Sequence, residues 1–141
     1  MRLPRLVLSL VLVLASAAQP ACADDVVDQA TKKKRVATAK SVAFFESRIR
    51  PVLVKHCYGC HSTDSGTAEG GLRVDSRKAI QAGGKRGPAV VPGNPKASWL
   101  LKAVSHSGSR LKMPPKQKRL PDSVIADLTA WIKMGAPDPR E

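Results

Sequence analysis

Aromatic residues, cysteines and long apolar runs are all scarce in this chain of 141 residues, which has room for one domain. Aromatic residues make up only 4% of it, so the polypeptide alone can bury only a modest hydrophobic core. Three cysteines leave little scope for structural disulfides to compensate. The longest nearly apolar run, Leu6 to Ala18, is shorter than the about 20 residues that a membrane-spanning helix needs.

The N-terminus has the pattern of a secretory signal. Arg2 and Arg5 form a basic start, an apolar run follows over residues 6–18, and Ala21-Cys22-Ala23 is a small-residue cleavage site. We therefore expect residues 1–23 to be a signal peptide and the mature protein to be periplasmic, or more generally extracytoplasmic.

Cleavage after Ala23 also removes Cys22, which leaves Cys57 and Cys60 as the only thiols of the mature chain. These two cysteines then have no partner for a structural disulfide except each other. The alternative is a lipoprotein anchored through an acylated Cys22, for which Gln19-Pro20-Ala21 is a poor preceding sequence.

Acidic residues are in the minority, with 11 against 24 basic residues and a net charge of +13. Loss of residues 1–23 removes two arginines and no acid, so 22 basic residues face 11 acidic ones and the charge becomes +11. Such a charge suits nucleic acid, but export argues against that partner. An acidic partner protein is the better expectation, with a transient contact to an anionic surface as a further one.

Residues 24–40 show little apolar periodicity and contain the basic run Thr31-Lys32-Lys33-Lys34-Arg35. Like charges in a row repel one another, so we expect a solvated, flexible basic leader here. Docking of this run to an acidic partner is the alternative. The folded domain is expected to span residues 41–141, beginning near Ser41.

The motif Cys57-Tyr58-Gly59-Cys60-His61 carries the most chemistry. On a helical turn Cys57, Cys60 and His61 share one face, which suits two thioether bonds to the vinyl groups of haem and an imidazole ligand to its iron. This is the pattern of c-type haem attachment. A thioredoxin-like dithiol needs a βαβ context and no histidine, and a zinc site needs a further ligand that the motif lacks.

Helical patterns flank this motif, and they predict an all-α domain. The expected helices cover residues 41–50, 52–57, 77–82, 95–104 and 122–134. The last is the clearest, because its apolar residues fall in one arc and Gly135 follows it. We expect the first and last helices to cross, with Phe45 against Trp131, around one buried haem.

A low-spin electron carrier needs a second axial ligand, and Met113 is our candidate. It lies in Leu111-Lys112-Met113-Pro114-Pro115, where two prolines can stiffen the loop and its soft thioether can favour ferrous iron. Met134 and His106 are its rivals. His56 adjoins the attachment site and cannot easily reach the other face of the haem.

The proximal His61 also needs a hydrogen-bond partner for its other ring nitrogen. Gly87-Pro88 can supply a backbone carbonyl, since proline keeps a free C=O and the glycine permits close approach. We therefore predict Pro88 as the residue that supports His61; a simple turn is the alternative.

From about Phe44 to Arg140 the sequence resembles the planctomycete-type cytochrome c domain, a branch of the class I cytochrome c fold. The resemblance is carried by Phe44-Phe45-Glu46, Ile49-Arg50-Pro51-Val52-Leu53, the Cys57–His61 motif, Gly70-Gly71-Leu72-Arg73-Val74-Asp75-Ser76, Gly87-Pro88-Ala89-Val90-Val91-Pro92-Gly93, Lys112-Met113-Pro114-Pro115 and Trp131-Ile132-Lys133-Met134-Gly135-Ala136-Pro137. It implies covalent haem at Cys57 and Cys60, with His61 and Met113 as the axial ligands. Domains of this family often precede large additional domains, so it leaves open whether this one acts alone.

Together these features predict an exported monohaem c-type cytochrome that cycles one haem c between Fe(III) and Fe(II) and exchanges single electrons with acidic redox partners. We expect no enzymatic activity. Two alternatives remain: a haem enzyme or gas sensor with an open distal site, in which His106 would act as acid and base, and a redox module of a larger extracytoplasmic assembly.

Overall fold

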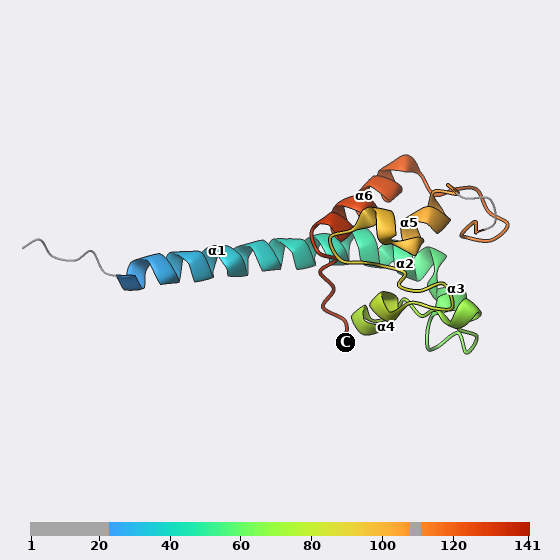
Figure 1. Cartoon of the computed structure of the whole chain (residues 1–141), viewed down its shortest axis with the longest axis horizontal. Coiled ribbons are helices and arrows are strands. Elements are labelled where there is room, and N and C mark those ends of the chain that lie inside the picture. Colours follow the sequence, from blue (N-terminus) through green and yellow to red (C-terminus); the bar gives the residue numbers. More distant parts are fainter. Residues whose placement is uncertain (1–22, 108–110) are drawn as a thin grey trace, which may run out of the picture.

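The computed structural model describes residues 23–107 and 111–141, and within these ranges the chain is helical and contains no strand. This confirms the predicted all-α class. Figure 1 shows a long helix, α1, that projects from a domain built of shorter helices. The elements in chain order are α1 (Ala23–Phe44), a π-helical turn (Phe45–Ile49), α2 (Arg50–His56), α3 (Tyr58–His61), a 3₁₀ turn (Glu69–Gly71), α4 (Arg77–Ala82), a second 3₁₀ turn (Pro95–Ala97), α5 (Trp99–Val104) and α6 (Asp122–Lys133).

The segment that we expected to be a flexible leader is helical and belongs to α1. Residues 31–40 are all exposed, as predicted for a solvated segment, but they are helical. Between Ala23 and Arg50 there is no glycine or proline, and alanine, lysine and arginine are strong helix formers. Helical propensity therefore prevails over repulsion within the basic run. The helix passes through Ser41 without a break, so Ser41 is not its N-cap.

Pro51 marks the next change in the backbone. The π-helical turn ends at Ile49 and α2 begins at Arg50, so the predicted boundary at Arg50 is correct to within a residue. Proline suits the first turn of a helix, because its missing N–H has no partner to bond there. At Cys57 the backbone leaves helical geometry, and α3 starts directly after it.

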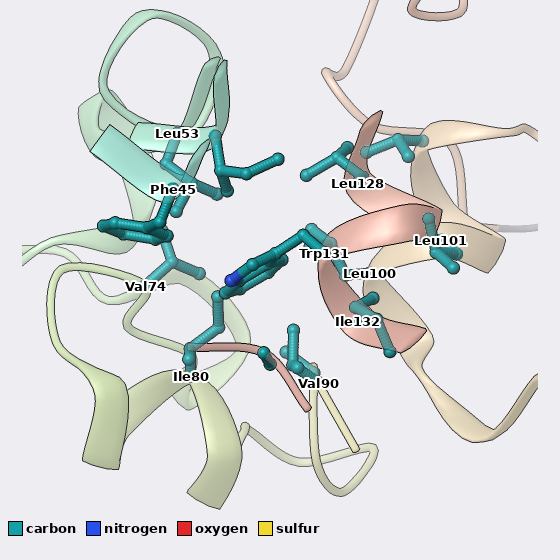
Figure 2. Close-up of a cluster of buried hydrophobic side chains, with 14 of the residues drawn as sticks. Phe45, Leu53, Val74, Ile80, Val90, Leu100, Leu101, Leu128, Trp131 and Ile132 are labelled. Atoms are coloured by element: carbon teal, nitrogen blue, oxygen red, sulfur yellow. The ribbon is translucent and has the colours of Figure 1, made fainter. Parts of the chain in front are cut away.

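The two ends of the domain meet at the predicted crossing of Phe45 with Trp131. Both side chains are fully buried, and their ring centroids lie 5.6 Å apart with the planes tilted by 41°. Figure 2 shows the two rings within one cluster of buried side chains that comes from both ends of the chain. The Trp131 indole N–H donates a hydrogen bond to the Pro137 carbonyl, 2.8 Å away, so burial leaves no polar atom of this ring unpaired.

Side-chain hydrogen bonds fix the helix starts in the middle of the chain. Ser76 caps α4 by accepting a hydrogen bond from the Ala79 N–H at 3.2 Å. The helix predicted over residues 95–104 is divided at Ser98, whose buried hydroxyl accepts from the Val91 N–H at 2.9 Å and donates to the Asn94 carbonyl at 2.9 Å. Ser98 thereby joins α5 to the turn that precedes it.

Gly83 ends α4 and brings the following segment back against it. Its φ of +75° lies in the region that glycine favours, and a Cβ there would sit only 1.9 Å from the Gly87 carbonyl oxygen. Gly84 and Gly87 pair through two backbone hydrogen bonds of 3.2 and 2.9 Å. This tight return brings residues 84–87 and Ala89 to the wall of a large cavity.

Among the helices that the structure describes, none combines the length and the apolar character needed to cross a membrane. The proposed signal peptide, residues 1–23, lies almost wholly outside the described ranges.

Candidate haem-binding site

The Cys57–His61 motif forms one turn of helix at the edge of a large cavity. The amides of Cys60 and His61 both donate to the Cys57 carbonyl, at 3.2 and 2.9 Å. The side chains of Cys57, Cys60 and His61 all line the same cavity. Both cysteines are free thiols, so no disulfide competes for them.

The cavity has a volume of about 650 Å³, which lies within the range of about 300–1,000 Å³ that small-molecule and cofactor sites occupy. Its walls come from the attachment turn, the segment 69–74, the return at 84–89, α5 and the loop before α6. Apolar side chains dominate these walls, and they include Leu72, Val74, Ala89, Trp99, Leu100, Ala103, Val104, Leu111, Pro114, Pro115 and Leu120.

His61 is held through its ring and through its backbone. Nδ1 lies 3.3 Å from the Leu72 carbonyl oxygen, and the His61 carbonyl accepts from the Val74 N–H at 2.8 Å. Because a carbonyl oxygen can only accept, Nδ1 is the protonated nitrogen in this bond. Nε2 is then left with its lone pair, which is the form of imidazole that binds a metal.

The partner of His61 corrects our prediction of Pro88. Leu72 supplies the carbonyl, whereas Pro88 is exposed and does not line the cavity, although both of its neighbours, Gly87 and Ala89, do. The cause is the return of the chain after α4. Pro88 packs against the end of that helix, where a Cβ on Gly83 would lie 2.6 Å from its Cα.

Side-chain hydrogen bonds close the loop that follows His61. The Ser62 hydroxyl donates to the Tyr58 carbonyl at 2.8 Å, and the Thr63 N–H donates to the Asp75 carboxylate. Partial burial acts to raise the pKa of Asp75, but the hydrogen bonds from Thr63 outweigh it, so the net pKa lies below the ordinary value of 3.8. The carboxylate is therefore ionised at neutral pH and ties the two ends of the loop together.

Met113 lines the same cavity as His61. Its N–H donates to the Ala103 carbonyl at 3.1 Å, and its own carbonyl lies 3.2 Å from Nε2 of His106. The backbone of this residue is thus tied to α5 on one side and to the His106 ring on the other. A thioether held in this way is a suitable second ligand for a haem iron.

The rivals of Met113 lie elsewhere. His106 does not line the cavity, since its ring is engaged with the Met113 carbonyl. Met134 follows α6 with 48% of its surface exposed. His56 does line the cavity, next to the attachment turn. Met113 is therefore the residue among the sequence candidates that shares the cavity with His61 and carries a soft sulfur donor.

The Cys57 thiol does not resemble the reactive thiol of a redox-active dithiol. Burial, and to a smaller extent the neighbouring Cys60, raises the pKa of the Cys57 thiol to about 11. Thioredoxin-like cysteines have a lowered pKa, because the thiolate is the reacting species. In the part of the chain that the structure describes, histidine, cysteine and acidic side chains do not gather in threes to hold a metal ion on their own.

Basic side chains also lie at the cavity, at positions that no sequence motif marks. Lys85 and Arg86 line it, and Trp99 carries two cations over its ring: Lys102 Nζ is 4.5 Å from the ring centroid and Arg86 Cζ is 6.0 Å from it. Positive charge at this rim suits an anionic group of a ligand. No sequence pattern marks these residues, because basic residues occur throughout the chain.

These residues fit a c-type haem. Two thiols and an imidazole with a free Nε2 are placed on one wall, a thioether is held on another, and an apolar space of suitable size lies between the elements that carry them. Two thioether-forming cysteines with an adjacent histidine are the attachment motif of haem c, and methionine is a known second ligand of its iron.

Comparison with known proteins agrees with this chemistry. A family model described as planctomycete cytochrome C matches residues 57–117, a range that includes Cys57, Cys60, His61 and Met113. No curated protein and no solved structure matches the chain. The matched range begins at the attachment turn and ends just after the Met113 loop, so it covers most of the cavity wall. Residues 57–117 of this chain therefore belong to the planctomycete cytochrome C family.

Proposed function

We propose that this protein is an exported monohaem c-type cytochrome that carries single electrons between redox partners. The family match over residues 57–117 supports this proposal, because it suggests a haem-binding electron carrier. One observation carries the finer proposal: the two cysteines, His61 and Met113 all line one cavity of about 650 Å³. The sequence contains one C-x-x-C-H motif, and all four of these residues share this one cavity, which supports one haem.

Each residue of the site has a role in this proposal. Cys57 and Cys60 hold the haem by thioether bonds, and His61 and Met113 bind its iron, which when bound supplies one reversible Fe(III)/Fe(II) step. The Leu72 carbonyl fixes the His61 ring. The apolar walls exclude water, so little rearrangement accompanies a change of charge.

Met113 provides the test that separates a six-coordinate carrier from an open haem site. In Met113→Ala we expect loss of the weak near-infrared sulfur-to-iron band, rapid binding of carbon monoxide to the ferrous protein, and a reduction potential lower by on the order of 0.1 V. Optical spectroscopy and redox titration measure these changes. Met134→Ala is the matched control, because Met134 is exposed and does not line the cavity. If the two variants behaved alike, Met113 would not be the ligand.

The alternative of a haem enzyme or gas sensor gains no support from the site. In that alternative, His106 would act as acid and base on the distal side of the haem. Its ring is instead hydrogen-bonded to the Met113 carbonyl and does not line the cavity. We therefore keep electron transfer as the function.

We place the protein outside the cytoplasm, with residues 1–23 removed as a signal peptide, and we propose acidic redox proteins as its partners. The net charge of +13, or +11 without the signal, supports the second point. Lys85 and Arg86, which line the cavity, and Lys102, which lies over the Trp99 ring, support it as well, because a haem in the cavity would exchange electrons near them.

This charge predicts a salt dependence with opposite signs for opposite reagents. Oxidation of the reduced protein by ferricyanide, an anion, should slow by about tenfold between low and high ionic strength, whereas oxidation by a cobalt complex cation should accelerate. Stopped-flow absorbance measures both rates. Lys85→Gln with Arg86→Gln should flatten the ferricyanide dependence more than Lys133→Gln, an exposed lysine at the end of α6. Rates that do not respond to salt would contradict steering by charge.

A further inference from the structure

The C-terminal segment after α6 ends in a buried ion pair. In Figure 1 this segment runs back across the molecule and finishes beside α4, where the Arg77 N–H donates to the Arg140 carbonyl at 3.1 Å. The Asp138 side chain is fully buried, and only 9% of the Arg140 side chain is exposed. Arg140 binds both carboxylate oxygens of Asp138, through Nε at 2.8 Å and through Nη2. A terminal segment that was free in solution would show none of this.

The remaining donors of Arg140 reach the attachment site. Nη1 donates to the Tyr58 hydroxyl and to the Val74 carbonyl, the latter at 3.0 Å. The guanidinium carbon also lies 4.8 Å from the centroid of the Phe45 ring. One side chain therefore joins the C-terminus to Tyr58 of α3, to the segment containing Val74 and to the core crossing.

Tyr58 and Val74 belong to the two segments that hold His61. Tyr58 lies between the two cysteines of the attachment turn. The Val74 N–H binds the His61 carbonyl, and the carbonyl that receives Nδ1 of His61 belongs to Leu72, two residues earlier. Arg140 thus bridges the turn that carries the imidazole and the segment that supplies its hydrogen-bond acceptor.

The chemistry of this bridge requires arginine. A guanidinium offers five donors in a planar fork, so it can bind a carboxylate with two bonds and still serve two further acceptors. A lysine ammonium is a single point and cannot span them. Burial acts to lower the pKa of Arg140, but the hydrogen bond and charge of Asp138, with a contribution from Tyr58, outweigh it, so the net pKa is raised and the group stays charged.

We propose that Arg140 is a positioning residue for the proximal ligand: by tying Tyr58 to the Val74 carbonyl, it holds the Leu72 carbonyl against Nδ1 of His61. This inference rests on the proposed function, since it gives His61 the role of haem ligand. A firm bond at Nδ1 makes the imidazole a stronger electron donor, which favours Fe(III) over Fe(II). Loosening the bridge should therefore raise the reduction potential.

The test uses the matured holoprotein with two variants that keep the net charge. Arg140→Lys removes the fork, and Tyr58→Phe removes one acceptor while keeping the ring. We expect the Nδ1 proton of His61 to exchange with solvent about three- to tenfold faster in both variants, the range that loss of one hydrogen bond gives. Proton NMR of the reduced protein measures this rate. The potential should rise in both variants.

Two controls separate local loosening from a general loss of stability. Arg119→Lys alters an exposed pair with Asp122, whose side chains are 44% and 85% exposed, and should change neither quantity. Within each variant, the Met113 amide, which bonds Ala103 on the other side of the cavity, should keep its exchange rate. Equal acceleration at Met113 and His61 would mean general destabilisation and would overturn the proposal.

The inference also fails if both variants match Arg119→Lys in exchange rate and potential while carrying covalent haem. If Arg140→Lys does not mature, Tyr58→Phe alone decides the question by the same two readouts. A parent protein without covalent haem would instead reject the proposed function, so the two failures are distinguishable.

Discussion

Replacing both Cys57 and Cys60 with serine is expected to yield a chain that keeps no haem after extraction with acidified organic solvent and that does not form a stable domain without it. The cavity of about 650 Å³ is lined by core residues such as Leu100, Val104 and Leu120. At about 24 cal/mol for each Å³ of space left in a core, an empty cavity of this size costs on the order of 10 kcal/mol or more. That cost matches or exceeds the free energy of unfolding of a typical domain, about 5–15 kcal/mol.

The measurement combines absorbance of the extracted polypeptide with circular dichroism before and after extraction. Cys57→Ser alone is the matched control, because one thioether bond remains and should keep the pigment attached. A double variant that retained pigment through extraction would show that the haem is held by some other bond. A pigment-free chain that remained fully folded would show that the core does not depend on the haem.

Trp131→Ala should lower the free energy of unfolding of the holoprotein by about 3–5 kcal/mol, the usual cost of truncating a large buried aromatic residue. Trp131 is fully buried, its ring lies 5.6 Å from that of Phe45, and its N–H satisfies the Pro137 carbonyl. The substitution removes the main contact between α6 and the π-helical turn. Because Pro137 precedes the segment with Asp138 and Arg140, we also expect the C-terminal ion pair to loosen.

Equilibrium unfolding in guanidinium chloride, followed by circular dichroism, measures this change as a shift of the midpoint at constant slope. Met134→Ala is the control on the same helix end, where the side chain is 48% exposed, and it should cost less than about 0.5 kcal/mol. Similar midpoints for the two variants would contradict the assignment of Trp131 to the centre of the core.

Local sequence signals predicted the parts of the fold that depend on neighbouring residues. The end of α6 is encoded within one turn of the helix, so Gly135 was sufficient to place it. The Phe45–Trp131 crossing followed from two amphipathic helices that had no other apolar face to cover. The prediction of a flexible, non-helical segment at residues 31–40 was wrong, because helix propensity outweighs charge repulsion there.

Features that depend on the path of the backbone could not be predicted from local sequence signals. The Leu72 carbonyl that supports His61 has no side-chain signature, and any residue at that position could supply it. Asp138 and Arg140 alternate with Pro137 and Pro139 near the end of the chain, a pattern that is typical of an exposed tail. Only the return of that tail to Tyr58, 82 residues away in sequence, reveals their role.

Covalent attachment of iron porphyrin is the claim on which every other step depends. The protein is produced in a host that attaches haem c and is then denatured in acid. Intact mass spectrometry of this sample measures the attachment directly. The account predicts a polypeptide heavier than its sequence by one haem, and that extra mass should vanish when Cys57 and Cys60 are both serine. A matured, soluble sample with the mass of the bare polypeptide would contradict it.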